Sequence, residues 1–182
     1  MSKALLIVDI QNDYFRGGRM ELLNPEAARD NTKKVAEAYR AKGLPVLYMQ
    51  HISLEDSAEF FLPDTDGIHI HKDITPQETD KVFIKHFPNS FRETELADYL
   101  KSSGIDELTI TGMMTHICID TTTRAAVDAG YKVTLIGDAC ATRDLHFAGK
   151  TTKAEEAHTA YLAAINDAFC PVVTTGEFLK EF

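Results

Sequence analysis

Three reactive side chains each lie just beyond a short apolar run of the sequence: Asp9, Lys85 and Cys118. A carboxylate, an ammonium and a thiol are the groups that nucleophilic acyl transfer needs, because the thiol attacks the carbonyl carbon while the other two groups manage the proton and the charge. Taken singly, each has an ordinary structural explanation: a loop carboxylate, a surface cation, a small buried residue. Their combination is what indicates chemistry.

The apolar runs that precede these residues predict the strands of a sheet. Six such runs lie at 4–8, 45–49, 81–84, 108–111, 132–136 and 171–173. Helical patterns lie at 25–42, 91–103, 118–129, 152–168 and 176–182. Alternation of strands and helices is typical of parallel strands joined by right-handed crossovers. We therefore predict a single domain over 1–182 with an α/β fold, in which three α/β/α layers surround a six-stranded, mostly parallel sheet of Rossmann-like type.

The carboxyl ends of parallel strands meet at one edge of the sheet, where ligands bind. We expect Asp9, Lys85 and Cys118 to converge there. Asp138, which follows the run 132–136, is expected to reach the same edge. Cys118 is predicted to open a helix, where free N–H groups and a partial positive charge favour a thiolate and an oxyanion. We therefore expect a depressed pKa for this thiol.

Composition limits the classes of function. The 182 residues carry 44% hydrophobic residues, enough for a globular core, and a net charge of −9, which counts against a nucleic-acid partner. No apolar run approaches the roughly 20 residues of a membrane span. Three cysteines without a CxxC pair are unlike a disulfide framework or a thiolate zinc site, so we expect a cytoplasmic location and packing roles for Cys140 and Cys170.

Four segments resemble the motifs of the isochorismatase-like cysteine hydrolases, within the nicotinamidase and isochorismatase superfamily. They are 8–15 (VDIQNDYF), 84–91 (IKHFPNSF), 112–126 (GMMTHICIDTTTRAA) and 137–143 (GDACATR). They occur in the family's order and spacing, and the resemblance covers essentially the whole chain.

This resemblance implies a catalytic triad of Asp9, Lys85 and Cys118. Asp9 would take the thiol proton and return it to the leaving amine, Lys85 would hold the Asp9 carboxylate, and Cys118 would form a thioester that water hydrolyses. It also implies a cis peptide at Met113–Met114. The N–H groups of Met114 and Cys118 would then form the oxyanion hole.

Departures from the family's patterns separate its branches. Nicotinamidases place an Asp-x-His pair after the second strand to bind a metal, and here only His51 occurs in that position. His51, His69 and His71 offer three imidazoles that can bind zinc, but their spacing favours solvated or hydrogen-bonded roles, so we predict no metal and no cofactor. True isochorismatases cleave a vinyl ether and lack the nucleophilic cysteine, so the presence of Cys118 argues against that chemistry.

The prediction from these departures is a metal-independent cysteine hydrolase that cleaves a C–N bond of amide type in a small molecule through a thioester. The alternatives are an isochorismatase-type or nicotinamidase-type hydrolase, or a non-catalytic binding protein on the same fold. Residues 51–78 show no clear period and form either a lid over the site or a surface excursion. From the family we expect a homo-oligomer, a dimer or tetramer. Charge and hydropathy predict no nucleic-acid or membrane partner, so the expected partner is a small-molecule substrate.

Overall fold

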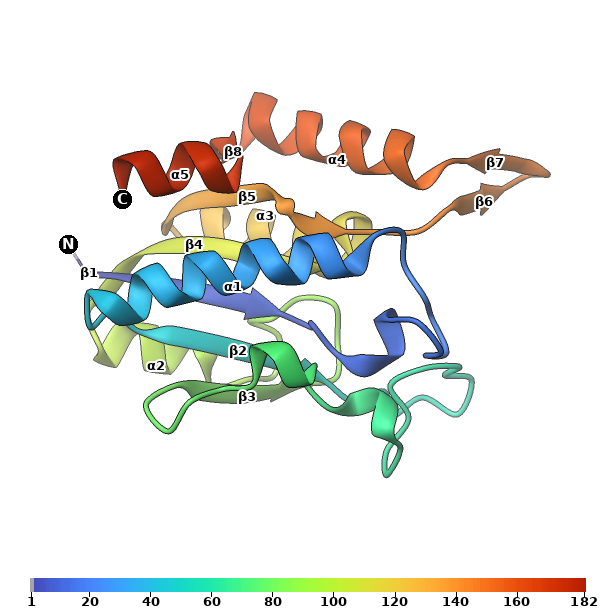
Figure 1. The fold of residues 1–182 in the computed structure, drawn as a ribbon, viewed down its shortest axis with the longest axis horizontal. Helices are drawn as coiled ribbons and strands as arrows, with labels where there is room; N and C mark the ends of the chain where they lie inside the picture. The colour runs from blue at the N-terminus through green and yellow to red at the C-terminus, as the bar shows by residue number, and fades with distance from the viewer. Residues whose placement is uncertain (1) are drawn as a thin grey trace.

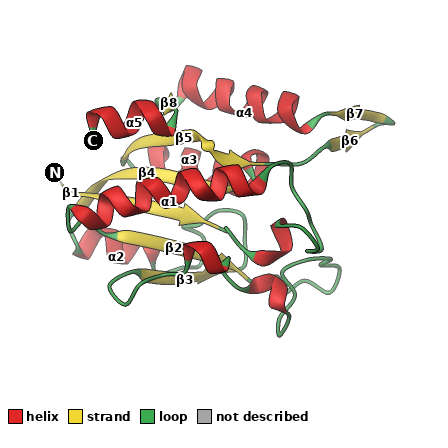
Figure 2. Ribbon diagram, viewed as in Figure 1, coloured by secondary structure: helices red, strands yellow, loops and turns green. Residues whose placement is uncertain are grey.

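The computed structural model describes residues 2–182, which build one six-stranded parallel sheet with helices on both faces (Figures 1 and 2). The strands lie in the order β3-β2-β1-β4-β5-β8. Their bounds are β1 Ser2–Val8, β2 Val46–His51, β3 Lys81–Lys85, β4 Ile105–Met113, β5 Lys132–Ala141 and β8 Val172–Val173. The helices are α1 Pro25–Ala41, α2 Leu96–Ser102, α3 Asp120–Asp128, α4 Ala154–Ala168 and α5 Thr175–Glu181. The predicted fold class is confirmed.

Both faces of the sheet are apolar because both are covered. Leu5 and Ile7 of β1 pack toward α1 and α5, whereas Leu6 and Val8 pack toward the core that α2 and α3 share. Successive side chains of a strand point to opposite faces, so a strand buried on both sides is a continuous apolar run. This is why the strands appear in the sequence as runs rather than alternations.

Two strands extend further than the sequence predicts, and the extension moves Asp138. Strand β4 continues through Gly112 to Met113, and β5 continues to Ala141, with Gly112 paired to Cys140 after a register shift. Asp138 therefore lies within β5, and the prediction that it follows the strand is wrong. Its Oδ1 atom accepts hydrogen bonds from the N–H and the hydroxyl of Thr175, each at 2.7 Å, and so fixes the start of α5.

The connections differ more from the predictions than the sheet does. Helix α2 begins at Leu96, so 91–95 are not helical. An antiparallel hairpin of β6 (Leu145–Phe147) and β7 (Lys150–Thr152) projects from the body (Figure 1). Phe147 in this hairpin is 87% exposed. The strands of the hairpin are too short to show a period. Among residues 2–182, no helix has the length and hydropathy of a membrane span.

Candidate active site

Three residues from three strand ends meet beyond the carboxyl edge of the sheet. Asp9 follows β1, Lys85 ends β3, and Cys118 lies in the turn after β4. The Lys85 Nζ atom is 2.7 Å from Asp9 Oδ2 and donates to Cys118 Sγ at 3.4 Å. Asp9 and Lys85 are fully buried, and Cys118 is 4% exposed. The structure thus brings together the three residues that the sequence singled out.

The backbone around Gly112 makes this approach possible. Gly112 has φ 130°, and a Cβ atom there would lie 2.0 Å from the Val8 carbonyl oxygen. A side chain at this position would therefore push β1 and β4 apart. Asp9, the residue after Val8, adopts φ 53°, a left-handed conformation that is unusual outside glycine. The close strand contact and this turn together aim the carboxylate at the segment that carries Cys118.

Lys85 is the centre of the cluster. Besides Asp9 and Cys118, its ammonium contacts His51 Nδ1 at 3.0 Å and the Phe87 carbonyl at 3.1 Å. Burial lowers the pKa of Lys85, but the nearby Asp9 carboxylate and the Cys118 sulfur outweigh burial, so the net pKa is raised. Lys85 is therefore an ammonium at neutral pH, and an ammonium can only donate.

His51 must accept this hydrogen bond at Nδ1, which assigns its proton to Nε2. Burial lowers the pKa of His51 to about 4, and the positive charge of Lys85 acts in the same direction although Asp9 opposes it. His51 is therefore a neutral acceptor at neutral pH. The spacing of the histidines in the sequence favoured a solvated or hydrogen-bonded role for His51 over metal binding, but it did not identify Lys85 as the partner.

The state of Cys118 differs from the prediction. Burial, and next the Asp9 carboxylate, raise the pKa of the Cys118 thiol to about 12, and Lys85 lowers it only in part. The residue lies inside a π-helical turn, Thr115–Ile119, and α3 begins after that turn. The prediction that Cys118 opens a helix with a depressed pKa is therefore wrong: the resting thiol keeps its proton.

The side chains that could bind a metal ion already contact the Lys85 ammonium. One ligand atom each of Asp9, His51 and Cys118 lies within 4.8 Å of the others, and all three residues contact the Lys85 ammonium. His69 lies instead beside Asp66, its Nδ1 atom 3.3 Å from the carboxylate. Within residues 2–182, His51, His69 and His71 do not come together as a group that could hold a metal ion. This donor set does not fit a metal site of the nicotinamidase kind.

The peptide bond before the nucleophile turn has the predicted form. Met113–Met114 is cis. The Met114 carbonyl accepts hydrogen bonds from the N–H groups of Ile117 and Ile119, each at 3.1 Å. Within residues 2–182, the Met114 N–H donates to no backbone carbonyl. It is thus an uncommitted donor next to the turn that holds Cys118.

A cavity of about 250 Å³ opens onto Cys118. One wall comes from the segment after β2 and includes Glu55 and Phe60, and the other includes His86 and Phe87. The aperiodic segment 51–78 therefore contributes a wall of the cavity. Sequence reasoning assigned no residue of this wall, because a segment without period gives no indication of which side chains face inward.

Polar contacts from the first motif hold this wall in place. Asp13 accepts hydrogen bonds from the N–H groups of Phe61, at 2.6 Å, and Arg19, at 3.1 Å. The Gln11 side chain donates to the His51 carbonyl at 2.8 Å and accepts from the His51 N–H at 2.7 Å. These residues position the wall and the imidazole rather than contact the thiol.

Comparison with known proteins agrees with this geometry. The family model of the isochorismatase domain matches residues 3–177. The chain belongs to the isochorismatase family. It is 46% identical over 180 residues to the uncharacterized isochorismatase family protein YddQ of Bacillus subtilis (strain 168), covering 99% of this chain and 100% of that protein.

Solved structures support the same family. A structure from Oleispira antarctica described as an isochorismatase hydrolase has a TM-score of 0.94 and 42% identity, over 98% of this chain and 96% of that one. The N-carbamoylsarcosine amidase of Thermoplasma acidophilum has a TM-score of 0.82 and 25% identity, over 96% and 97% of the two chains. This isochorismatase-family chain is therefore a hydrolase.

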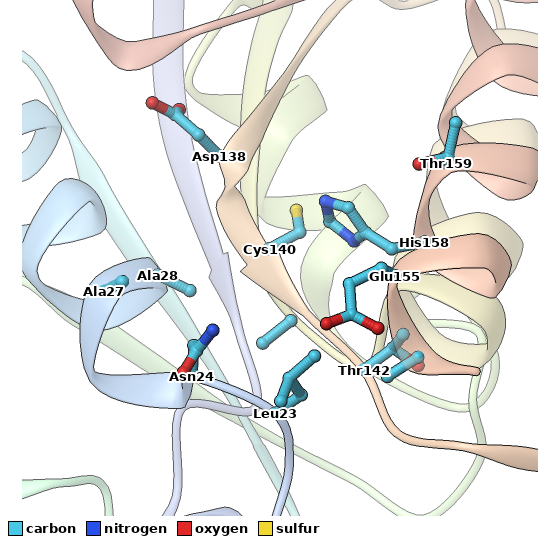
Figure 3. A pocket seen from close by; sticks show the side chains of 12 residues that line it. Leu23, Asn24, Ala27, Ala28, Asp138, Cys140, Thr142, Glu155, His158 and Thr159 are labelled. Atoms are coloured by element: carbon cyan, nitrogen blue, oxygen red, sulfur yellow. The ribbon is translucent and has the colours of Figure 1, made fainter.

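A second cavity lies beside Cys140. It has a volume of about 350 Å³ and lies between α1, β5 and α4, where Cys140, Glu155 and His158 line it (Figure 3). The His158 Nδ1 atom is 2.9 Å from Thr115 Oγ1. The Cys140 thiol donates to the Ile136 carbonyl at 3.4 Å. Cys140 is thus a buried thiol in a cavity whose lining, within residues 2–182, includes the carboxylates of Asp138 and Glu155 but no Lys or Arg.

Proposed function

We propose that this chain is a metal-independent cysteine hydrolase that cleaves a C–N bond of amide type in a small molecule. Cys118 is the nucleophile, Asp9 the general base and acid, and Lys85 the cation that holds both. The observation that carries this proposal is the buried Lys85 ammonium, which contacts Asp9 Oδ2 and Cys118 Sγ at the floor of a small cavity. The similarity to an amidase supports the choice of bond.

In the first step the Cys118 sulfur attacks the carbonyl carbon while its proton passes to Asp9. The raised pKa of the thiol means that the proton leaves as the S–C bond forms, because a free thiolate is scarce. The negative charge moves to the carbonyl oxygen. The N–H groups of Met114 and Cys118 stabilise this oxyanion, and each such donor is typically worth about 3–4 kcal/mol of transition-state stabilisation.

In the second step the tetrahedral intermediate collapses. The C–N bond breaks, and Asp9 gives its proton to the leaving nitrogen, which departs as an amine or ammonia. The acyl group remains on Cys118 as a thioester. Water then attacks the thioester carbon and gives a proton to Asp9, and this proton returns to the Cys118 sulfur as the carboxylic product leaves. Lys85 stays an ammonium throughout and keeps Asp9 oriented.

The test is a panel of small amides, ureides and carbamates assayed for ammonia release, with the acyl-enzyme trapped by rapid acid quench and measured by intact mass. We expect Cys118→Ala to lose both turnover and the mass adduct. Cys140→Ala is the matched control, because it removes another buried thiol away from Lys85. Turnover by Cys118→Ala above a few per cent of the wild-type kcat, or an adduct on Cys140, refutes the proposal.

A further inference from the structure

The cavity above Cys118 has a composition that bears on the charge of its ligand. Its volume of about 250 Å³ lies below the roughly 300–1,000 Å³ of ordinary ligand pockets, so it accepts a small molecule. Phe60, Phe87 and Tyr14 give it aromatic walls. The Tyr14 and Phe60 rings lie 5.8 Å apart, centroid to centroid, which fixes one side of the cavity.

The lining of the cavity, within residues 2–182, contains a carboxylate but no ammonium or guanidinium group. This carboxylate is that of the exposed Glu55. His51 is neutral, because its Nδ1 atom accepts a hydrogen bond from the Lys85 ammonium at 3.0 Å. His86 uses its Nδ1 atom on the Ile52 carbonyl at 2.7 Å. The Lys85 ammonium beneath the cavity is matched by Asp9 and adds no net charge.

Two further cations lie close to the cavity but outside its lining. The Arg92 guanidinium stacks on the Phe87 ring, 3.6 Å from the centroid. Burial raises the pKa of Tyr14, and the positive charge of Arg143 opposes that rise. Arg143 therefore lies near Tyr14. Neither is among the residues that face the ligand. A carboxylate in the cavity would therefore meet aromatic walls and Glu55 without a paired cation, which is unfavourable.

We propose that this cavity selects neutral or ammonium-bearing amides and rejects amides that carry a carboxylate, with Glu55 as the residue that sets the preference between the charged classes. This rests on the proposed function, since Cys118 is taken as the reacting atom. The ligand's amide carbon lies at Cys118, its apolar part lies against Phe60 and Phe87, and a cationic end group reaches the mouth near Glu55.

The test uses Cys118 as a reporter with three alkylating agents of similar size: neutral iodoacetamide, anionic iodoacetate and cationic 2-bromoethylamine. Rates are measured by mass spectrometry at Cys118 and compared with those of 2-mercaptoethanol, a neutral free thiol. We expect the iodoacetate-to-iodoacetamide rate ratio at Cys118 to be about 10-fold lower than for the free thiol. Glu55→Gln should raise this ratio roughly 3-fold and lower the relative rate with 2-bromoethylamine.

Glu78→Gln is the matched control, since it makes the same change at an exposed position of the same segment outside the cavity. A parallel assay compares kcat/KM for butyramide, 4-aminobutyramide and succinamate, and we expect succinamate to be the poorest. A ratio at Cys118 equal to or above that of the free thiol overturns the charge preference. If the protonated Cys118 thiol reacts with none of the reagents, the three kcat/KM values decide, and a value for succinamate equal to that for butyramide overturns the preference. If Cys118→Ala hydrolyses these amides as fast as the wild type, the proposed nucleophile itself is wrong, and the preference falls with it.

Discussion

Replacing Lys85 by Met removes the cation at the centre of the buried cluster. The Lys85 Nζ to Asp9 Oδ2 distance is 2.7 Å, and both side chains are fully buried. At an effective dielectric constant of about 20, two charges at this separation attract by about 6 kcal/mol. Most of this attraction offsets the desolvation of the pair, but removing one partner leaves the other as an uncompensated buried charge. Breaking such a pair typically destabilises a protein by about 3–5 kcal/mol.

The pH dependence of this effect follows from the direction of the lysine shift. The pKa of Lys85 is raised, so the pair's contribution to stability is fully present below the unfolded lysine value of about 10.4 and is lost only as pH rises beyond it. The wild-type contribution is therefore constant between pH 6 and pH 9.

The measurement is urea unfolding followed by circular dichroism at pH 7.5. We expect Lys85→Met to lower the free energy of unfolding by about 3–5 kcal/mol. Lys81→Met, an exposed lysine on the same strand, is the matched control and should change it by less than about 0.5 kcal/mol. The double variant Asp9→Asn/Lys85→Met should be less destabilised than Lys85→Met alone. A Lys85→Met loss under 1 kcal/mol would refute the reasoning.

Four further measurements test other parts of the site. Alkylation of Cys118 by iodoacetamide should quicken about tenfold per pH unit from pH 7 to pH 10, because its pKa is raised to about 12, and a plateau below pH 9 would contradict this. The activity of the wild type should survive exhaustive chelation. The Lys85→Ala variant should gain Zn²⁺ binding, measured as a zinc-dependent rise in Tm, because Asp9, His51 and Cys118 are then free as ligands. Gly112→Ala should destabilise the fold by about 2 kcal/mol or more and lower kcat, since its Cβ would collide with the Val8 carbonyl. Gly176→Ala is the control: open space surrounds this glycine, so neither stability nor kcat should fall.

The positions of the three residues of the proposed triad were predictable because they depend on local pattern and topology. Short apolar runs predicted the strands that precede Asp9, Lys85 and Cys118, and parallel connections bring strand ends to one edge. The extent of the strands was not predictable in the same way. Gly112 looks like a strand terminator in the sequence, but the structure uses its lack of a side chain to let β4 continue beside Val8. Asp138 was misplaced for a related reason, since β5 lengthens along with β4.

The protonation of Cys118 could not be predicted from its neighbours in the sequence. The local argument considered only a helix N-terminus, which favours a thiolate. The dominant effect is burial, and the surroundings of Cys118 come from several parts of the chain. Its core cluster includes Leu6 and Leu96, and the wall that includes Phe60 lines the cavity beside it. That wall is held by the distant hydrogen bonds of Asp13 to Phe61 and Arg19. A pKa that depends on segments far apart in the chain needs the fold before it can be assigned.

The neutral thiol and the central ammonium make one consistent electrostatic arrangement. At rest the buried site holds the Asp9 carboxylate, the Lys85 ammonium, a protonated Cys118 and a neutral His51, so its charges cancel. In the proposed attack, the proton moves to Asp9 and the negative charge moves to the substrate oxygen, so the charges cancel again. A thiolate at rest would instead leave a net negative charge in a buried site, which burial penalises. The raised pKa of Cys118 is therefore compatible with catalysis, because the nucleophile forms only when a substrate carbonyl is present to receive the charge.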